Sequence, residues 1–273
     1  MCRSDYHIHS EFSGDCEEKL ELIFESAIKK GLKEVAITDH LDLDYPGNKK
    51  MFDLNFKRYI EILKEYRDKY KGRLEIKIGL ELGLQPHLKD DKFLNEILSS
   101  KELDFIIGST HCVEKKELDK DEFFSEKTKD ESHKLYFDEV YKNIRAFNGV
   151  SVCGHLDFVK RYGKKYFKDH RKINYPVHGE AIDKILKVLI RKEMGLEINT
   201  SGYRYGGSDS TPNEYILRRY SELGGKIITL GSDAHRSEDI GEGLDKACKL
   251  LKNCGFNSYS IFNKKQVQFK KIN

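Results

Sequence analysis

Short apolar runs alternate along the chain with longer segments of helical periodicity. The apolar runs predict seven strands, over residues 5–9, 35–38, 74–82, 105–109, 150–154, 195–199 and 226–231. Between them, apolar residues spaced three and four apart predict helices over residues 17–30, 54–70, 134–147, 181–192, 213–223 and 244–254. Gly31 is expected to end the first helix, because glycine favours the backbone conformation of a C-cap.

The regular alternation of strand and helix predicts parallel βα units. Seven strands favour a barrel of such units, and an open doubly wound sheet is the competing architecture. We find no internal repeat and no linker, so residues 1–273 are expected to form one domain, a size that βα barrels commonly reach. Two long loops are expected, over residues 41–53 and 201–212, and loops of this length often close over a site.

Histidines and carboxylates gather at the predicted strand ends. Six of the ten histidines stand at or shortly after the C-terminal end of a strand, namely His7, His9, His40, His111, His155 and His235. Glu81 and Asp233 occupy equivalent positions. The C-terminal ends of the strands form the active face of a βα barrel, so these side chains are expected to converge there.

These residue types point to a metal centre. In His7-Ile8-His9 the two imidazoles lie two residues apart on a strand and share one face. Imidazole nitrogens and carboxylate oxygens suit zinc, manganese or iron. A buried cluster of this kind would be strongly destabilising without a metal. The remaining histidines stand in loop or helical contexts and are not expected to bind metal, namely His87, His133, His170 and His178.

Composition excludes several classes of function. The 49 basic and 46 acidic residues give a net charge of +3 with no basic stripe, which argues against a nucleic-acid partner. No apolar stretch approaches the length of a membrane span, and the N-terminus lacks the apolar core of a signal peptide, so a cytoplasmic location is expected. The six cysteines form no C-x-x-C pair and are expected to be free thiols, namely Cys2, Cys16, Cys112, Cys153, Cys248 and Cys254.

The strand-end motifs form an ordered set: His7-x-His9, Asp15, Thr38-Asp39-His40, Gly79-Leu80-Glu81, Ser109-Thr110-His111, Gly154-His155-Leu156-Asp157, Glu197-Ile198-Asn199 and Gly231-Ser232-Asp233-Ala234-His235. This set resembles the polymerase and histidinol phosphatase (PHP) family, from residue 5 to about residue 255. Within that family the spacing is most similar to the monofunctional histidinol phosphatases of histidine biosynthesis.

The resemblance implies a distorted (β/α)7 barrel with three divalent metal ions. It assigns the first ion to His7, His9, Glu81 and Asp233. The second ion would share Glu81 as a bridge and add His111 and His155, and the third would take Asp15, His40 and His235. Many family members have histidine where this chain has Asp15, so Glu17 is an alternative ligand for the third ion.

The implied reaction is hydrolysis of L-histidinol phosphate to L-histidinol and phosphate. Three divalent cations facing three carboxylates leave positive charge for a phosphate, and a metal-bridging hydroxide is the expected nucleophile. Arg161 matches an arginine of the similar phosphatases and is expected to bind phosphate during catalysis. Arg204 and Asn199 are further candidates for binding the substrate. Asp42 is a candidate to protonate the leaving alkoxide or to pair with the amine of the substrate.

Three alternatives remain open on the sequence. The same chemistry could act on another small phosphate ester or a nucleotide, or on the end of a nucleic acid, which the charge balance disfavours. A non-catalytic barrel module is disfavoured because all nine ligand positions are occupied by residues that bind metals. The sequence determines neither the metal nor the oligomeric state.

Overall fold

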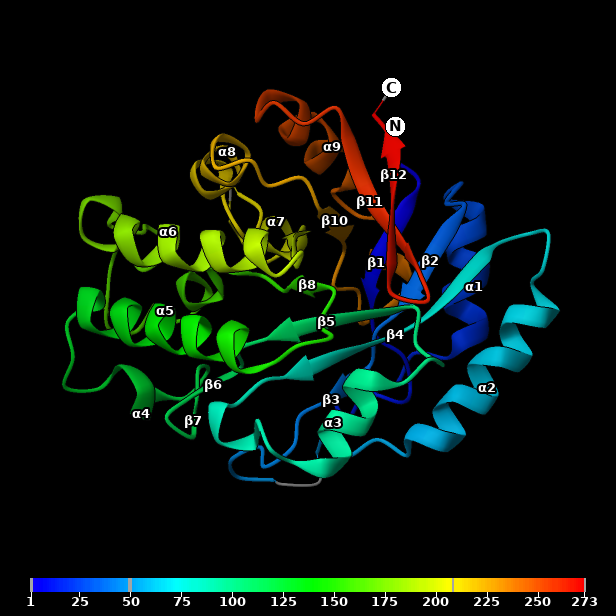
Figure 1. The fold of residues 1–273 in the computed structure, drawn as a ribbon, viewed down its shortest axis with the longest axis horizontal. Helices are drawn as coiled ribbons and strands as arrows, with labels where there is room; N and C mark the ends of the chain where they lie inside the picture. Colours follow the sequence, from blue (N-terminus) through cyan, green and yellow to red (C-terminus); the bar gives the residue numbers. More distant parts are fainter. Residues whose placement is uncertain (1, 49–50, 208, 273) are drawn as a thin grey trace.

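The computed structural model describes residues 2–48, 51–207 and 209–272, and in these ranges seven parallel strands follow one another in chain order (Figure 1). Residues 49–50 and 208, which belong to the two predicted loops, lie outside the described residues. A short strand, His40–Leu41 (β3), pairs beside the path with the end of β4. The path consists of β1 (Ser4–Ile8), β2 (Glu34–Ile37), β4 (Glu75–Gly83), β5 (Phe105–Ser109), β8 (Val152–Cys153), β9 (Gly195–Asn199) and β10 (Ile228–Gly231).

The first and last strands of this path meet, which nearly closes the sheet into a barrel. The Asp233 N–H donates to the His7 carbonyl at 2.8 Å, and the His9 N–H donates to the Ala234 carbonyl at 2.9 Å. Ile8 and Ala234 form a parallel bridge at the same place. The prediction of a distorted (β/α)7 barrel is confirmed. The alternative of an open doubly wound sheet is wrong, because its edge strands would not meet.

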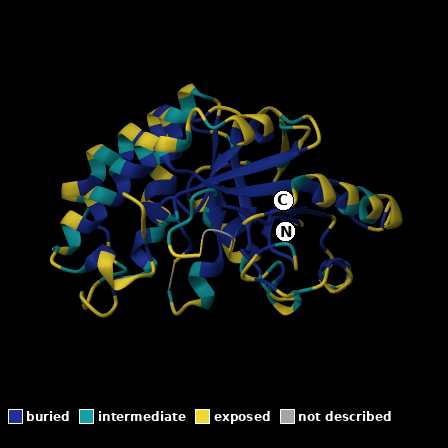
Figure 2. Ribbon diagram, turned by 90° about the horizontal axis from the view of Figure 1, so that it is seen from below, coloured by how far each residue is buried: buried dark blue, intermediate teal, exposed yellow. Residues whose placement is uncertain are grey.

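Helices cover the outside of the barrel, so the strands are buried while the outer helix faces are exposed (Figure 2). In α1 (Leu20–Lys29), Leu20, Ile23, Phe24 and Ala27 are buried, and Gly31 follows with a φ of +77°, as expected of a glycine that ends a helix. The other helices are α2 (Phe56–Lys69), α3 (Lys92–Ser99), α4 (Asp121–Phe124), α5 (Lys129–Ala146), α6 (Tyr175–Arg191), α7 (Ser201–Arg204), α8 (Glu214–Glu222) and α9 (Leu244–Asn253). In the described part of the chain, none of the helices has the length and apolarity that crossing a membrane requires.

Several elements were not predicted. Helix α3 fills the connection between β4 and β5, and β6 (Cys112–Val113) pairs with β7 (Lys116–Glu117) in a short hairpin. A second hairpin joins β11 (Ser258–Asn263) to β12 (Gln266–Lys271). The Phe262 ring lies 5.1 Å from that of Phe105, and the Phe262 N–H donates to the Tyr6 hydroxyl at 2.8 Å. This hairpin therefore packs against residues of the barrel strands.

Two cysteines correct the expectation of six free thiols. Cys2 and Cys248 form a disulfide with a Cα–Cα distance of 6.0 Å. They are 246 residues apart in the sequence, so no spacing motif marked them, and the folded chain brings the start of β1 beside α9. The four remaining cysteines are free and buried, namely Cys16, Cys112, Cys153 and Cys254.

Candidate metal centre and adjoining cavity

The strand ends carry the predicted ligands to one place. His7 lies on β1 and His9 directly follows it, Glu81 lies within β4, and His40 begins β3. The remaining ligands lie in the segments after β1, β5, β8 and β10, namely Asp15, His111, His155, Asp233 and His235. The structure thus brings all nine predicted ligands into one connected set of contacts.

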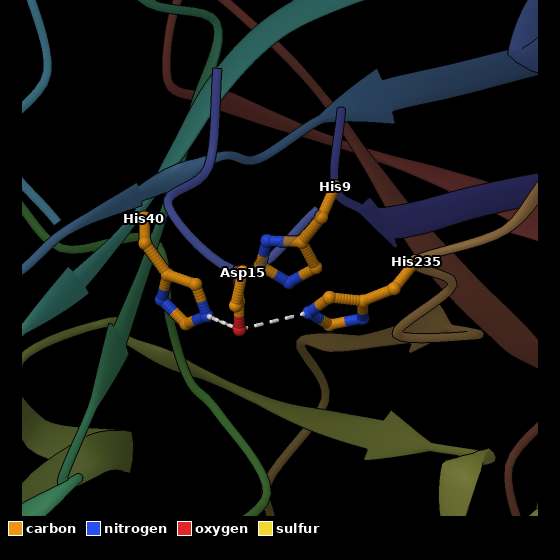
Figure 3. A group of neighbouring side chains, drawn as sticks. All are labelled: His9, Asp15, His40 and His235. Atoms are coloured by element: carbon orange, nitrogen blue, oxygen red, sulfur yellow. Dashed lines mark hydrogen bonds and ion pairs between the residues drawn. The ribbon is translucent and has the colours of Figure 1, made fainter. Parts of the chain in front are cut away.

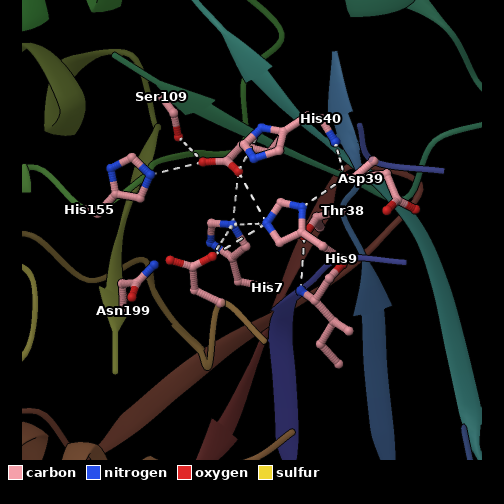
Figure 4. A network of polar contacts seen from close by, with 12 residues as sticks. His7, His9, Thr38, Asp39, His40, Ser109, His155 and Asn199 are labelled. Carbon is pink, nitrogen blue, oxygen red and sulfur yellow. Dashed lines mark hydrogen bonds and ion pairs between the residues drawn. The ribbon is translucent and has the colours of Figure 1, made fainter. Parts of the chain in front are cut away.

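Glu81 lies at the centre of this set, because its carboxylate contacts imidazoles that Figure 4 labels, among them His7 and His155. Its Oε2 is 3.0 Å from His7 Nε2 and 3.4 Å from His9 Nε2. Its Oε1 is 2.9 Å from His155 Nε2 and 3.2 Å from His111 Nε2. The two carboxylate oxygens therefore face two different groups of imidazoles, which is the arrangement that a bridging carboxylate needs.

A second group surrounds Asp15 (Figure 3). Asp15 Oδ2 lies 3.3 Å from His235 Nε2 and 3.7 Å from His40 Nε2, and His9 also places a nitrogen within 4.8 Å of the other donor atoms. Asp15 is exposed at the rim, so a ligand there would be open to solvent on one side. Glu17 is exposed and belongs to none of the metal-binding groups found in the described ranges.

The buried contacts of His7 test whether a cation fits the site. His7 Nδ1 lies 2.5 Å from Glu197 Oε1, and since a carboxylate only accepts, Nδ1 carries the proton. In the neutral ring, the Nε2 lone pair then faces Glu81 Oε2 and His9 Nε2, each 3.0 Å away. Acceptors this close need a positive charge between them, from a proton or a metal ion. The nitrogen and oxygen donors suit a divalent metal such as zinc.

The charges of the cluster suit metal binding. Burial alone would raise the pKa of Glu81, but the imidazoles of His7 and His40 outweigh it and hold this pKa well below its usual range. Burial, assisted by positive charge on His235 and His40, lowers the pKa of His9 to about 3. At neutral pH Glu81 is therefore ionised and His9 is neutral, and these are the forms that bind metals. Burial would lower the pKa values of His7 and His111, but the neighbouring carboxylates outweigh it and raise both well above the usual range, so a metal ion that binds there displaces a proton.

A cavity of about 410 Å³ opens beside the cluster. Arg161 lines it, and its guanidinium lies over the Tyr205 ring at 3.6 Å from the centroid, with Nη1 3.9 Å from Asp233 Oδ2. The lining combines members of the cluster with an apolar and aromatic wall made of Tyr45, Met51, Phe52, Leu118, Phe158, Tyr162 and Tyr205. The cavity can therefore accommodate a molecule with an anionic end near the cluster and an aromatic end against the wall.

Asp42 lies behind the cluster and does not line this cavity. It is 3% exposed, with Oδ2 2.6 Å from His111 Nδ1 and Oδ1 accepting from the Gly83 N–H at 3.0 Å. Both carboxylate oxygens are thus engaged with the protein. Direct contact between Asp42 and a substrate stays a prediction.

Arg204 and Asn199 also lie behind the cluster. Arg204 Nη2 donates to the carbonyls of Ser232 and Asp233, each at 2.7 Å. The Asn199 side-chain oxygen Oδ1 accepts from the Ser201 hydroxyl at 2.6 Å, and the same hydroxyl lies 3.1 Å from Asp233 Oδ2. Neither predicted residue lines the cavity, so their contact with substrate also stays a prediction. Asn199 pairs through its backbone with Gly231, two residues before Asp233.

Sequence reasoning missed three residues of this region. Glu197 belongs to a matched motif but was given no role, although it lies on the same strand face as Asn199, two residues away. Asp119 and Tyr205 line the cavity from loops, where the sequence has no period that indicates direction. Only Glu197 therefore carried a signal that could have identified it.

Fold and site together define the class: a βα barrel with a metal-binding cluster at the C-terminal ends of its strands. A family model described as the PHP domain matches residues 5–201. This chain belongs to the PHP domain family.

Relatives cover nearly the whole chain. A histidinol-phosphatase of Lactococcus lactis is 35% identical over 96% of this chain and 95% of its own length. A probable histidinol-phosphatase of Clostridium acetobutylicum is 31% identical over 96% of this chain and 97% of its own length. The crystal structure of a Lactococcus lactis histidinol phosphate phosphatase, complexed with zinc, L-histidinol and phosphate, superimposes with a TM-score of 0.89 at 33% identity, covering 97% of this chain and 98% of that one.

Proposed function

We propose that this chain is a metal-dependent phosphomonoesterase that hydrolyses L-histidinol phosphate to L-histidinol and phosphate. One observation carries the proposal: a cluster of imidazoles and carboxylates borders a cavity of about 410 Å³ that Arg161 and an aromatic wall also line. The Lactococcus lactis structure, which holds zinc, L-histidinol and phosphate, supports this choice of metal and substrate.

We assign three metal ions to the cluster, with zinc as the first candidate. His7, His9, Glu81 and Asp233 would hold one ion. Glu81 would be shared with a second ion, held also by His111 and His155, since its two oxygens face the two groups separately. Asp15, His40 and His235 would hold the third. When bound, such ions lower the pKa of water and neutralise charge on a phosphate.

Arg161 would hold the phosphate. Hydrolysis joins a water oxygen to phosphorus and breaks the phosphorus–oxygen bond to the alcohol, whose oxygen then takes up a proton. A guanidinium beside the cluster can donate two hydrogen bonds to phosphate oxygens. The stacking of Arg161 on Tyr205 limits the orientations of the guanidinium before substrate binds.

The rest of the cavity suits the organic part of the substrate. Tyr45, Phe52 and Tyr162 present apolar surface that can cover an imidazole and exclude water. Asp119 lines the same cavity, and it is the carboxylate of the described lining that we do not assign to a metal. We therefore pair Asp119 with the ammonium group of L-histidinol phosphate.

A phosphate-release assay tests the proposal. Purified protein with quantified zinc would be compared on L-histidinol phosphate, nucleoside monophosphates, sugar phosphates and an aryl phosphate. We expect kcat/KM for L-histidinol phosphate to exceed that for each other substrate by at least about a hundredfold, or roughly 2.7 kcal/mol of transition-state binding. Equal, low activity on all substrates would contradict the substrate, and the absence of bound zinc, manganese and iron would contradict the metal centre.

A further inference from the structure

A buried carboxylate that is not among the nine predicted ligands lies behind the cluster. Glu197 comes from β9 and is 1% exposed. Its Oε1 lies 2.5 Å from His7 Nδ1, and its Oε2 accepts a hydrogen bond from the His155 backbone N–H at 2.8 Å. One side chain outside the cavity lining thus contacts two of the residues that we assign to metals.

These contacts determine which nitrogen of His7 faces the metal centre. Because the carboxylate of Glu197 only accepts, the proton of the neutral His7 ring lies on Nδ1. Nε2 then presents its lone pair toward Glu81, whose Oε2 is 3.0 Å away. Carboxylates that hold a metal-binding imidazole in this way set its tautomer and its orientation.

The neighbouring strand leaves space for this contact. A Cβ added at Gly231 on β10 would lie 2.4 Å from the His7 Cβ and 2.6 Å from Glu197 Oε1. Backbone and side chain would both have to move for any larger residue there. Glycine at this position therefore allows the imidazole and the carboxylate to meet.

We propose that Glu197 is a positioning residue that holds His7 in its Nδ1–H form and thereby orients Nε2 for metal binding. This inference rests on the proposed metal-dependent function. An amide cannot replace the carboxylate. If a glutamine accepted from His7, its NH₂ group would face the His155 N–H, which is also a donor. In the opposite orientation, the NH₂ group would force the His7 proton onto Nε2, where it blocks the metal.

Asp42 contacts the imidazole of His111 in the same way that Glu197 contacts the imidazole of His7. One of its oxygens lies 2.6 Å from His111 Nδ1, and the other accepts from the Gly83 N–H at 3.0 Å. A Cβ at Gly83 would lie 2.2 Å from the Asp42 Cγ, so glycine again makes room for the carboxylate. Asp42 thus positions His111, whose Nε2 faces Glu81 at 3.2 Å.

Zinc affinity of the full chain tests both positions. Protein stripped of metal would be titrated with zinc in competition with a chromophoric chelator, and circular dichroism would verify the fold. We expect E197Q and D42N each to weaken the binding of at least one zinc ion by about 10- to 100-fold. The matched control is E139Q, because Glu139 is also buried but lies on α5, where it contacts Lys142. The zinc affinity of E139Q should equal that of the wild-type protein.

A second measurement needs no variant. In zinc-loaded wild-type protein with ¹⁵N-labelled histidine, we expect His7 and His111 to carry protons on Nδ1 and to bind zinc through Nε2. Zinc bound through Nδ1, or zinc affinity in E197Q and D42N equal to wild type, would overturn the positioning roles. A wild-type chain that binds no zinc would contradict the proposed function instead, so the two failures are distinguishable.

Discussion

Arg204 supports the turn that carries Asp233. The guanidinium donates to the Asp233 carbonyl at 2.7 Å and, from the same nitrogen, to the preceding carbonyl of Ser232 at 2.7 Å. Asp233 has a φ of +54°, a left-handed conformation that costs a residue with a side chain roughly 1–2 kcal/mol. Hydrogen bonds from a half-buried cation offset this strain and hold the carboxylate toward the cluster.

We therefore expect R204M to lower the free energy of unfolding by about 1.5–3 kcal/mol, the range for hydrogen bonds to charged groups. Zinc affinity should fall as well, because the Asp233 turn loses its support. Denaturant unfolding of the zinc-loaded protein measures the first effect and chelator competition the second. R236M is the matched control, because Arg236 pairs at the surface with Glu238 and its loss should cost under 1 kcal/mol. Unchanged stability in R204M would contradict the role of Arg204.

A methyl group at Gly231 should damage the site more than the fold. The added Cβ would displace the His7 side chain and Glu197, so G231A is expected to lose most of its zinc affinity and activity. Gly179 in α6 provides the contrast, since a Cβ there meets nothing closer than 3.8 Å. G179A should keep full zinc affinity and gain about 0.5–1 kcal/mol of stability from the lower chain entropy of alanine. Wild-type zinc binding in G231A would show that the space is not needed.

Asp119 should affect substrate choice without affecting the chemistry. Its side chain is 44% exposed and also contacts Lys120, so its pairing with a substrate ammonium is screened by water. An exposed ion pair contributes about 0.2–1 kcal/mol, which corresponds to a rise in KM of up to about fivefold in D119N. The effect should appear with L-histidinol phosphate and be absent with an aryl phosphate, which has no ammonium. D121N, two residues away and outside the cavity lining, should behave as wild type; equal KM shifts for both substrates would refute the pairing.

His133 should make the protein less stable in acid. Burial, then the positive charges of His178 and Lys129, lowers its pKa to about 4 from the ordinary 6.5. The folded state therefore favours neutral His133, while the unfolded chain binds the proton freely below pH 6.5. The stabilisation is complete above pH 6.5 and is lost as the pH falls toward 4, by up to about 3 kcal/mol.

Urea unfolding of wild type and H133N between pH 7.5 and 4.5 measures this loss. Both proteins have the same metal centre, so the difference between their unfolding free energies isolates His133, which lies on α5 and contacts His178 on α6. We expect the difference to shrink on acidification. A difference that stays constant with pH would contradict the lowered pKa.

The sequence predicted the strands and the cluster because both depend on local periods. All seven strands were found, and strand-end placement was enough to bring His7, Glu81 and His155 together, since barrel strands point their C-terminal ends to one face. The positions of Asp42 and Arg204 were not predictable in the same way. Both stand a few residues after a predicted strand end, where a residue can face the cavity. Only the three-dimensional structure shows that their polar atoms contact other protein groups instead.

Short elements and distant pairs were missed. Helix α3 has only eight residues and strand β12 only six, so the helical spacing of Leu94, Ile97 and Leu98 and the alternation of Val267 and Phe269 with polar residues each extend over a few positions. The disulfide between Cys2 and Cys248 joins parts of the chain separated by 246 residues, and no sequence spacing indicates such a pair.

The closure of the barrel between β1 and β10 determines when the metal centre can form during synthesis. His7 and His9 leave the ribosome before the other barrel strands are made, whereas Asp233 and His235 follow the last of those strands. At 5–20 residues per second, the intervening chain takes on the order of ten to forty seconds to make. Throughout that time the nascent chain exposes imidazoles with no complete site to hold a metal. The set of metal ligands is therefore completed late, and a chain that ends before residue 233 carries an incomplete metal centre.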